Sequence, residues 1–248
     1  MAPNFNSIYL PYAGTSRPWL GMDTQENLRK NLTEFPDLME QWRNREIRYQ
    51  FNSHGFRCDE FSDTDSIMFL GCSITLGMAL PSDLTWTTQV ARALGLRCVN
   101  LAQGGASADT AFRMCLGWIE RIKPRYVVYL KPPRIRWELV WDDRIEFCGA
   151  WRTDWKNSQS PYMHYVNDYM EDDNNDYFND RKNTLAIESL CRQQAVPLLI
   201  YDSRQDLISL QIQNPEDIAR DCLHPGVLAN HTFAQRVIED IQNMDKNN

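Results

Sequence analysis

Three separate segments of the sequence hold side chains that together could carry out nucleophilic catalysis. Ser73 follows shortly after the apolar run Ile67–Leu70, and Asp221 precedes His224 by three positions near the C-terminus. An aspartate so close to a histidine can accept a hydrogen bond from the imidazole, which fixes the tautomer and leaves the other ring nitrogen as a general base. A serine hydroxyl beside such a base can act as the nucleophile of acyl transfer.

Both segments also have ordinary structural interpretations. Between a strand and a helix, Ser73 can be a helix N-cap, or it can expose its hydroxyl at the sheet edge beside amides that stabilise an oxyanion. Asp221 can likewise cap the following helix, with His224 left at the surface. Taken separately, neither pattern decides between catalysis and capping.

The third segment combines glycines with capping residues. Gly104 and Gly105 follow soon after Asn100, and glycine lets backbone amides approach a ligand closely. The same segment can be a turn before a helix that Ser107 or Asp109 caps. The pattern therefore predicts either an amide-lined site or a plain connection.

Apolar runs and helical spacing divide most of the chain into alternating strands and helices. Strands are expected over 47–52, 66–71, 97–101, 126–130 and 196–201, and helices within 23–42 and over 85–94, 108–122, 181–194 and 227–242. In the helix over 108–122, Phe112, Leu116 and Ile119 are expected to share one face. Such alternation predicts a parallel sheet covered on both faces, with any site at the carboxyl ends of its strands.

Two stretches do not follow this alternation. Residues 1–46 lack a clean period, and we interpret them as an N-terminal extension that packs on an α/β domain of residues 47–248. Residues 131–180 hold four of the eight tryptophans and the acidic run 171–173, and we interpret them as an insertion or lid outside the sheet. The acidic run fits no calcium loop, so a solvated turn is the simpler interpretation.

The composition argues against several classes of protein. Hydrophobic residues make up 43% and charged residues 24% of the 248 residues, as in soluble globular proteins. The apolar runs are too short to cross a bilayer, and the net charge of −7 argues against nucleic acid or an anionic membrane as a partner. No segment resembles a secretion signal, which predicts a cytoplasmic protein and leaves association with a viral particle open.

The cysteines give no sign of a metal site or a disulfide framework. There are seven of them, an odd number, and none forms a C-x-x-C pair. We therefore expect buried, reduced thiols, and we expect neither a metal ion nor an organic cofactor.

The order of the three segments resembles the SGNH hydrolases, also called the GDSL esterase/lipase family. The chain has Gly71-x-Ser73 after a strand, Asn100-x4-Gly105 after the next strand, and Asp221-x-x-His224-Pro225 before the last helix. Residues 52–57 (NSHGFR) also resemble a lead-in found in many members. The resemblance extends over about residues 47–242 and implies a three-layer α/β/α sandwich with a flavodoxin-like parallel sheet.

The resemblance also implies a role for each residue. Ser73 matches the nucleophile, His224 the base that moves its proton, and Asp221 the acid that orients the histidine. The backbone amides of Ser73 and Gly105 match two oxyanion-hole donors. The implied activity is hydrolysis of a small-molecule or carbohydrate ester through an acyl-enzyme.

The sequence departs from the family pattern at two positions. Cys72 stands where the family usually has aspartate, and a small buried residue there is the simplest interpretation. Pro133 stands where the family usually has the asparagine that donates a third oxyanion hydrogen bond. Proline has no such donor, and losing one can cost about two to three powers of ten in rate. Arg134 or Arg136 could replace it, or both could form surface ion pairs.

The tryptophans of the insertion suggest a substrate. Trp137 and Trp141 follow the third predicted strand of the sheet closely, and exposed aromatic faces near a cleft can stack on sugars. Stacking of this kind suggests an esterified carbohydrate as substrate, for example one that loses an acetyl group, whereas the simpler interpretation is that these rings pack the insertion onto the body. Two alternatives stay open, namely acyl transfer to a sugar and a carbohydrate-binding module that has lost catalysis.

Overall fold

A four-stranded parallel sheet forms the centre of the protein. The computed structural model describes residues 11–141, 144–149 and 173–246. The strands are β3 (Ser66–Leu70), β4 (Arg97–Asn100), β5 (Tyr126–Lys131) and β8 (Leu198–Asp202), in the order β4-β3-β5-β8. Met68 of β3 is paired with Val99 on one side and Val127 on the other. The first strand of this sheet thus lies between the second and the third, as in doubly wound α/β folds.

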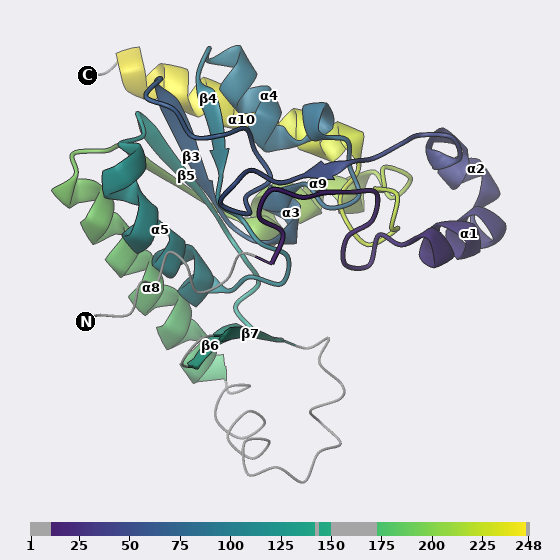
Figure 1. Ribbon diagram of the computed structural model, residues 1–248, viewed down its shortest axis with the longest axis horizontal. Helices are drawn as coiled ribbons and strands as arrows, with labels where there is room; N and C mark the ends of the chain where they lie inside the picture. The colour runs from purple at the N-terminus through teal and green to yellow at the C-terminus, as the bar shows by residue number, and fades with distance from the viewer. Residues whose placement is uncertain (1–10, 142–143, 150–172, 247–248) are drawn as a thin grey trace, which may run out of the picture.

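Helices cover both faces of this sheet (Figure 1). The helices on one face are α4 (Trp86–Ala93) and α10 (Val227–Lys246), and those on the other are α5 (Ala108–Ile122) and α8 (Asp173–Gln193). Side chains of β3 alternate between the two layers, because Ile67 and Phe69 join the core under α4 and α10 while Met68 and Leu70 join the core under α5 and α8. The predicted three-layer α/β/α architecture is confirmed.

Within this core, one predicted helix face is wrong. The bounds of α5 match the prediction, but Leu116 is 45% exposed, whereas Met114, Cys115 and Trp118 are buried. The helix is apolar on more than one side, so spacing alone cannot decide which side turns toward the sheet.

The predicted strand over 47–52 contributes only β2 (Tyr49–Gln50). β2 pairs antiparallel with β1 (Ser16–Arg17), outside the central sheet. The alternation that suggested a strand has a different cause, because Ile47, Tyr49 and Phe51 point into a separate hydrophobic cluster. That cluster joins the N-terminal segment to the body.

The N-terminal segment shares this cluster with two loops of the α/β body. It contains α1 (Gln25–Glu34), α2 (Pro36–Met39) and a 3-10 turn (Glu40–Trp42). Met39 and Trp42 are fully buried against the segment 76–80 and the segment 218–219. The Trp42 indole N–H donates to the Ile218 carbonyl at 3.1 Å. Figure 1 shows α1 and α2 extending from one end of the molecule, away from the four-stranded sheet.

The insertion is more regular than predicted. β6 (Arg136–Trp141) and β7 (Arg144–Gly149) pair as an antiparallel two-stranded sheet, separate from the main one. Helix α8 begins at Asp173, within the predicted insertion, and not near Arg181. Residues 171 and 172 of the acidic run lie outside the described residues, as do Trp151 and Trp155.

The sequence pattern does not predict the early start of α8, because the buried face of the helix is polar there. Asp176, Asn179 and Asp180 are all buried, so this part of the helix shows no apolar period. The Asn179 amide donates to Asp109 of α5 at 3.0 Å, and Lys131 pairs with Asp180 at the end of β5. Hydrogen bonds and ion pairs therefore replace hydrophobic packing in this region.

A buried ion pair attaches the β6–β7 sheet to the body. Arg113 of α5 donates from two nitrogens to the Glu138 carboxylate at 2.6 and 2.9 Å. The Glu138 backbone N–H donates to Asp109 at 3.2 Å. None of the described helices is both long and apolar enough to cross a membrane.

We predict that Gly71→Ala destabilises the fold more than Gly95→Ala. A Cβ at position 71 would overlap Thr75 Oγ1 and lie 2.9 Å from the backbone oxygen of Leu130, whereas a Cβ at 95 meets nothing within 4 Å. Gly95 has φ +65°, so its substitution should cost about 1–2 kcal/mol from the left-handed conformation alone. Gly71 also has a positive φ, of +158°, so Gly71→Ala adds overpacking of about 1–3 kcal/mol to a backbone cost. Urea unfolding of both variants measures the difference, and equal losses would contradict the steric argument.

Candidate active site

The structure brings Ser73, His224 and Asp221 into one hydrogen-bonded chain. His224 Nε2 lies 2.9 Å from Ser73 Oγ, and His224 Nδ1 lies 2.6 Å from Asp221 Oδ2. The Asp221 side chain is fully buried and that of His224 is 17% exposed. A proton can therefore pass from the hydroxyl to the imidazole while the carboxylate holds the ring.

The Asp221 carboxylate is arranged to stay ionised. Its Oδ1 accepts hydrogen bonds from the backbone N–H groups of Leu223 at 3.0 Å and His224 at 3.2 Å. Burial by itself raises the pKa of Asp221, but the hydrogen bond and charge of His224 and the two amides outweigh burial and hold the pKa below its usual value. An ionised Asp221 accepts the Nδ1 proton, so Nε2 is left to accept the proton of Ser73.

The end of β3 places Ser73. After the buried strand, Cys72 is the N-cap of α3 (Ser73–Leu76), and Gly77 in the left-handed conformation ends that helix after one turn. The serine is therefore the first helical residue and not the cap. Cys72 is fully buried in the core beneath α10.

The loop that carries the histidine is held by its own backbone. The Ala219 N–H donates to the His224 carbonyl at 3.0 Å, and Cys222 between them has φ +59°. Asp217 accepts the N–H groups of Leu228 and Ala229 in the first turn of α10. The cap of α10 is thus Asp217, and Asp221 is left to bind the imidazole.

The glycine loop lies against the same turn. Asn100 at the end of β4 donates from Nδ2 to the Thr75 carbonyl of α3 at 2.8 Å, and its Oδ1 accepts the Ala102 N–H at 3.1 Å. Gly105 has φ +77°, and Ser107 caps α5. Among the described residues, no hydrogen-bond acceptor faces the backbone N–H of Ser73 or Gly105. These two amides are available to a ligand.

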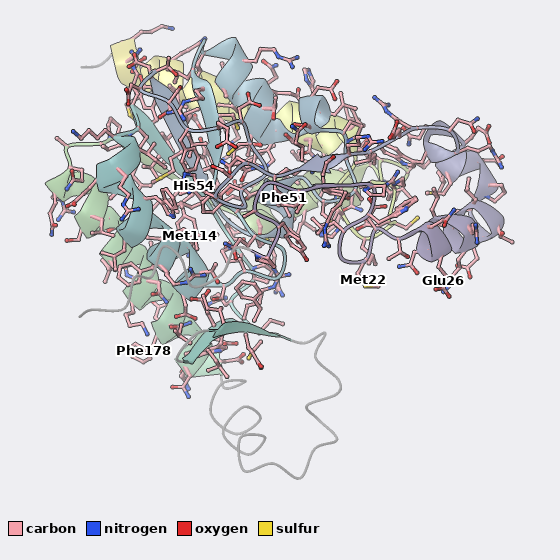
Figure 2. All side chains as sticks on the ribbon, in the orientation of Figure 1. Met22, Glu26, Phe51, His54, Met114 and Phe178 are labelled. Carbon is pink, nitrogen blue, oxygen red and sulfur yellow. The ribbon has the colours of Figure 1, made fainter. Side chains whose placement is uncertain are left out.

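Ser73 and His224 lie in the wall of a cavity of about 590 Å³. The mainly apolar part of the lining consists of Tyr12, Leu20, Met22, Phe51, Leu76 and Met78. The β6–β7 sheet contributes Arg136, Ile145, Glu146 and Phe147. Phe51 and Met22 lie between the main sheet and helices α1 and α2 in the view of Figure 2. The N-terminal lining was not foreseen from the sequence, where no motif marks it.

The structure places the predicted third oxyanion donors and substrate-binding tryptophans in different surroundings. Arg136 lines the cavity, whereas Arg134 is exposed and lies outside the lining that the described residues form. The Trp137 indole N–H donates to Asp176 of α8 at 3.0 Å, so this ring is directed to the helix. Trp141 ends β6, and its side chain lies outside the described part of the structure.

The described residues contain no cluster of three or more His, Cys, Asp or Glu side chains that could hold a metal ion. Among the seven cysteines, Cys72, Cys115, Cys148 and Cys191 are buried. Burial raises the pKa of the Cys58 thiol to about 12, so it stays protonated at neutral pH.

Comparison with known proteins gives similarity to solved structures only, since no protein-family model and no curated protein matches the sequence. The structure of TesA is 12% identical, covers 70% of this chain and 96% of its own, and has a TM-score of 0.42. The esterase EstA from Pseudoalteromonas sp., inhibited by monoethylphosphonate, is 14% identical over 74% of this chain and 100% of its own, with a TM-score of 0.39.

A carbohydrate esterase, described as having an active site with divergent catalytic and non-catalytic binding functions, is 11% identical. It covers 72% of this chain and 65% of its own, with a TM-score of 0.42. These names agree with the hydrolase family that the motifs resemble. Because the TM-scores lie below 0.5, the similarity carries no argument about function, which depends on the geometry of the site alone.

The turn after α3 depends on one buried arginine. The Arg57 guanidinium donates to the carbonyls of Leu76, Gly77 and Leu80 and lies over the Tyr49 ring at 4.5 Å. Burial lowers the pKa of Arg57 to about 10, so it remains charged at neutral pH. Arg57 belongs to the NSHGFR segment, and the structure gives that segment an anchoring task beside the site.

We predict that Arg57→Leu lowers the free energy of unfolding by at least about 2 kcal/mol, at about 1–3 kcal/mol for each of the Leu76 and Leu80 carbonyls, which lose their donor. The Gly77 carbonyl keeps the Leu80 N–H. Arg97→Leu is the matched control, because Arg97 also donates to two carbonyls, those of Ser62 and Thr64, but near the surface. Water can replace the Arg97 donor there, so Arg97→Leu should lower the free energy of unfolding by about 1 kcal/mol or less. Chemical denaturation compares the two, and a similar loss in both would refute the anchoring role.

Proposed function

We propose that the protein is a serine ester hydrolase that forms an acyl-enzyme on Ser73. The supporting observation is the unbroken chain from Asp221 to His224 to Ser73, with contacts of 2.6 and 2.9 Å, in the wall of a cavity. Ser73 and Gly105, whose N–H groups bond to no acceptor among the described residues, both line the same cavity. A ligand-binding module would need neither the proton relay nor these amides.

The geometry supports a two-step mechanism. Ser73 Oγ attacks the ester carbonyl carbon while its proton passes to His224 Nε2, and the carbonyl oxygen, now negative, accepts hydrogen bonds from the Ser73 and Gly105 amides. The tetrahedral intermediate collapses when His224 protonates the leaving alcohol oxygen. Water then attacks the acyl-enzyme with His224 again as the base, which releases the carboxylic acid and restores the serine.

The third oxyanion donor differs from the family pattern. Pro133 offers neither a side-chain donor nor an N–H. Arg136 is the cation that β6 brings to the cavity lining, and we propose that its positive charge takes over part of this task. An arginine side chain is longer and less rigid than the asparagine that it would replace, so a modest rate is expected.

The cavity favours an ester with a sizeable apolar group over an acetylated sugar. Its volume of about 590 Å³ lies in the range that takes drug-sized ligands, and an acetyl group would fill little of it. Leu20, Met22 and Phe51 make one wall apolar. The sugar-stacking interpretation of Trp137 loses support, because that ring bonds to Asp176 of α8. Acyl transfer to a sugar uses the same acyl-enzyme and stays a prediction.

We predict that Ser73→Ala abolishes hydrolysis of p-nitrophenyl butyrate while the thermal unfolding temperature stays near that of the wild type. Without the hydroxyl no acyl-enzyme can form, so turnover should fall to near the uncatalysed rate. Ser82→Ala, at an exposed serine, is the control and should keep full activity. Undiminished turnover by Ser73→Ala refutes the assignment. A wild-type Ser73 that no fluorophosphonate labels would indicate the binding module instead.

We also predict that kcat/KM rises along p-nitrophenyl esters from acetate to hexanoate. Each buried CH₂ is worth about 0.8 kcal/mol, or about fourfold in kcat/KM, until the cavity is filled. Met22→Asp places a charge on the apolar wall at a residue that is 56% exposed. It should therefore lower the rate with hexanoate more than that with acetate. A preference for acetate, or for an acetylated sugar, contradicts an apolar substrate.

A further inference from the structure

We infer that Asp23 and Arg220, which do not belong to the proton relay, are positioning residues that hold the loop of Asp221 and His224 against Ser73. The inference rests on the proposed function, because it concerns the geometry of the same relay. Asp23 lies just before α1 in the N-terminal segment, and Arg220 directly precedes Asp221. The pair therefore connects a segment outside the α/β body to the histidine loop.

The contact between the two side chains is bidentate and buried. Arg220 Nε donates to Asp23 Oδ1 at 2.8 Å, and Nη2 donates to Oδ2 at 2.7 Å. The side chains are 3% and 1% exposed. Two parallel charge-assisted bonds fix the plane of a guanidinium as well as its distance. Arg220 can therefore define an orientation, which a single contact would not.

Every other group of Arg220 is also engaged. Its Nη1 donates to the Arg45 carbonyl at 3.3 Å and its Nη2 to the Pro18 carbonyl at 3.2 Å, while the guanidinium lies 4.3 Å from the Trp19 ring centroid. Its backbone oxygen accepts from the Asn31 amide at 3.4 Å. All four partners come from the N-terminal segment, so this segment holds the residue next to Asp221 from several sides.

The network also reaches the turn that follows Ser73. The Arg220 N–H donates to the Ala79 carbonyl at 3.2 Å, and the Ala79 N–H donates to Tyr49 Oη at 2.8 Å. The Tyr49 hydroxyl in turn donates to Asp23. Burial and the charge of Asp23 raise the pKa of Tyr49, so the phenol keeps the proton that it donates. Asp23 thus links the histidine loop and the serine turn through one buried carboxylate.

Backbone strain shows that both segments need such support. Ala79 and Cys222 each have φ +59°, a left-handed conformation that residues with a side chain avoid. Strain of this kind persists only where the surroundings over-determine the conformation. Ala79 lies in the turn after Ser73, and Cys222 lies between Asp221 and His224. We call the ion pair of Asp23 and Arg220 the clamp. Without the clamp we expect both segments to relax, and the Ser73–His224 contact would lengthen.

A purely stabilising role would give a different result. Buried ion pairs contribute little net stability, and apolar pairs of similar volume often replace them without loss. An apolar pair, however, has no directional bonds that could fix the orientation of the side chain at position 220, next to Asp221. The double variant D23L/R220M therefore separates the two roles. It leaves no unpaired buried charge, so it should recover part of the stability that Asp23→Asn loses, and it should not recover the alignment.

The test compares the kinetics of Asp23→Asn, D23L/R220M and the control Ile241→Ala with those of the wild-type chain. Ile241 is fully buried near the far end of α10, so its truncation lowers stability without touching the clamp. At a temperature where all variants are folded, both clamp variants should lose about 100-fold in kcat with little change in KM, since a misplacement of about 1 Å costs that much. Ile241→Ala should keep its kcat.

A second measurement does not depend on activity. The His224 Nδ1 proton in its 2.6 Å bond to Asp221 should give a far-downfield proton NMR signal in the wild type and in Ile241→Ala. The signal should shift upfield or broaden away in both clamp variants. If the wild type hydrolyses no ester, the proposed function fails, while the NMR signal still decides whether the clamp orients His224.

Three results would overturn the inference. The first is an Asp23→Asn variant with kcat within twofold of the wild type. The second is a D23L/R220M variant that regains both stability and kcat, which would mean that packing alone supports the loop. The third is a His224 NMR signal that is unchanged in both clamp variants, because the clamp would then not orient His224.

Discussion

Parallel pairing on both sides of β3 is the constraint on which the site depends. The strand is buried along its whole length between β4 and β5, so it cannot shift without breaking two ladders at once. The chain leaves it at Gly71, where the Leu130 oxygen is too close for any larger residue. Ser73 therefore starts α3 at a fixed height above the sheet, and Asn100 binds the glycine loop to the same short helix.

Around this rigid edge, the cavity is completed by two peripheral pieces that polar contacts hold in place. The N-terminal segment, which a hydrophobic cluster joins to the body, is also tied to it by the ion pair of Asp23 with Arg220. The β6–β7 sheet is tied to the body by the ion pair of Arg113 with Glu138. Hydrophobic burial is not directional, whereas a bidentate ion pair sets both distance and orientation. This explains why charged groups are buried beside a site whose distances must be kept. The result is a cavity whose reactive wall belongs to the α/β body and whose apolar wall combines Leu20 and Met22 of the extension with Phe51 of the body.

Much of the α/β body could be predicted from the sequence because its elements are local. The four strands of the central sheet and the helix over 108–122 have clear apolar patterns, and their observed bounds lie close to those expected. The polar start of α8 could not be found in this way, because Asp176, Asn179 and Asp180 are buried by hydrogen bonds to other elements. The exposed Leu116 shows the converse limit, since an apolar residue on a helix need not face the core.

The sequence by itself determined which residue types are available to the site and where they fall relative to strand ends, because these are matters of composition and short-range spacing. Tertiary structure alone decided that His224 meets Ser73 from 151 positions away, that Trp137 turns to α8, and that Asp23 finds Arg220 across 197 positions. Contacts over such separations depend on how whole layers pack, and no local pattern records them.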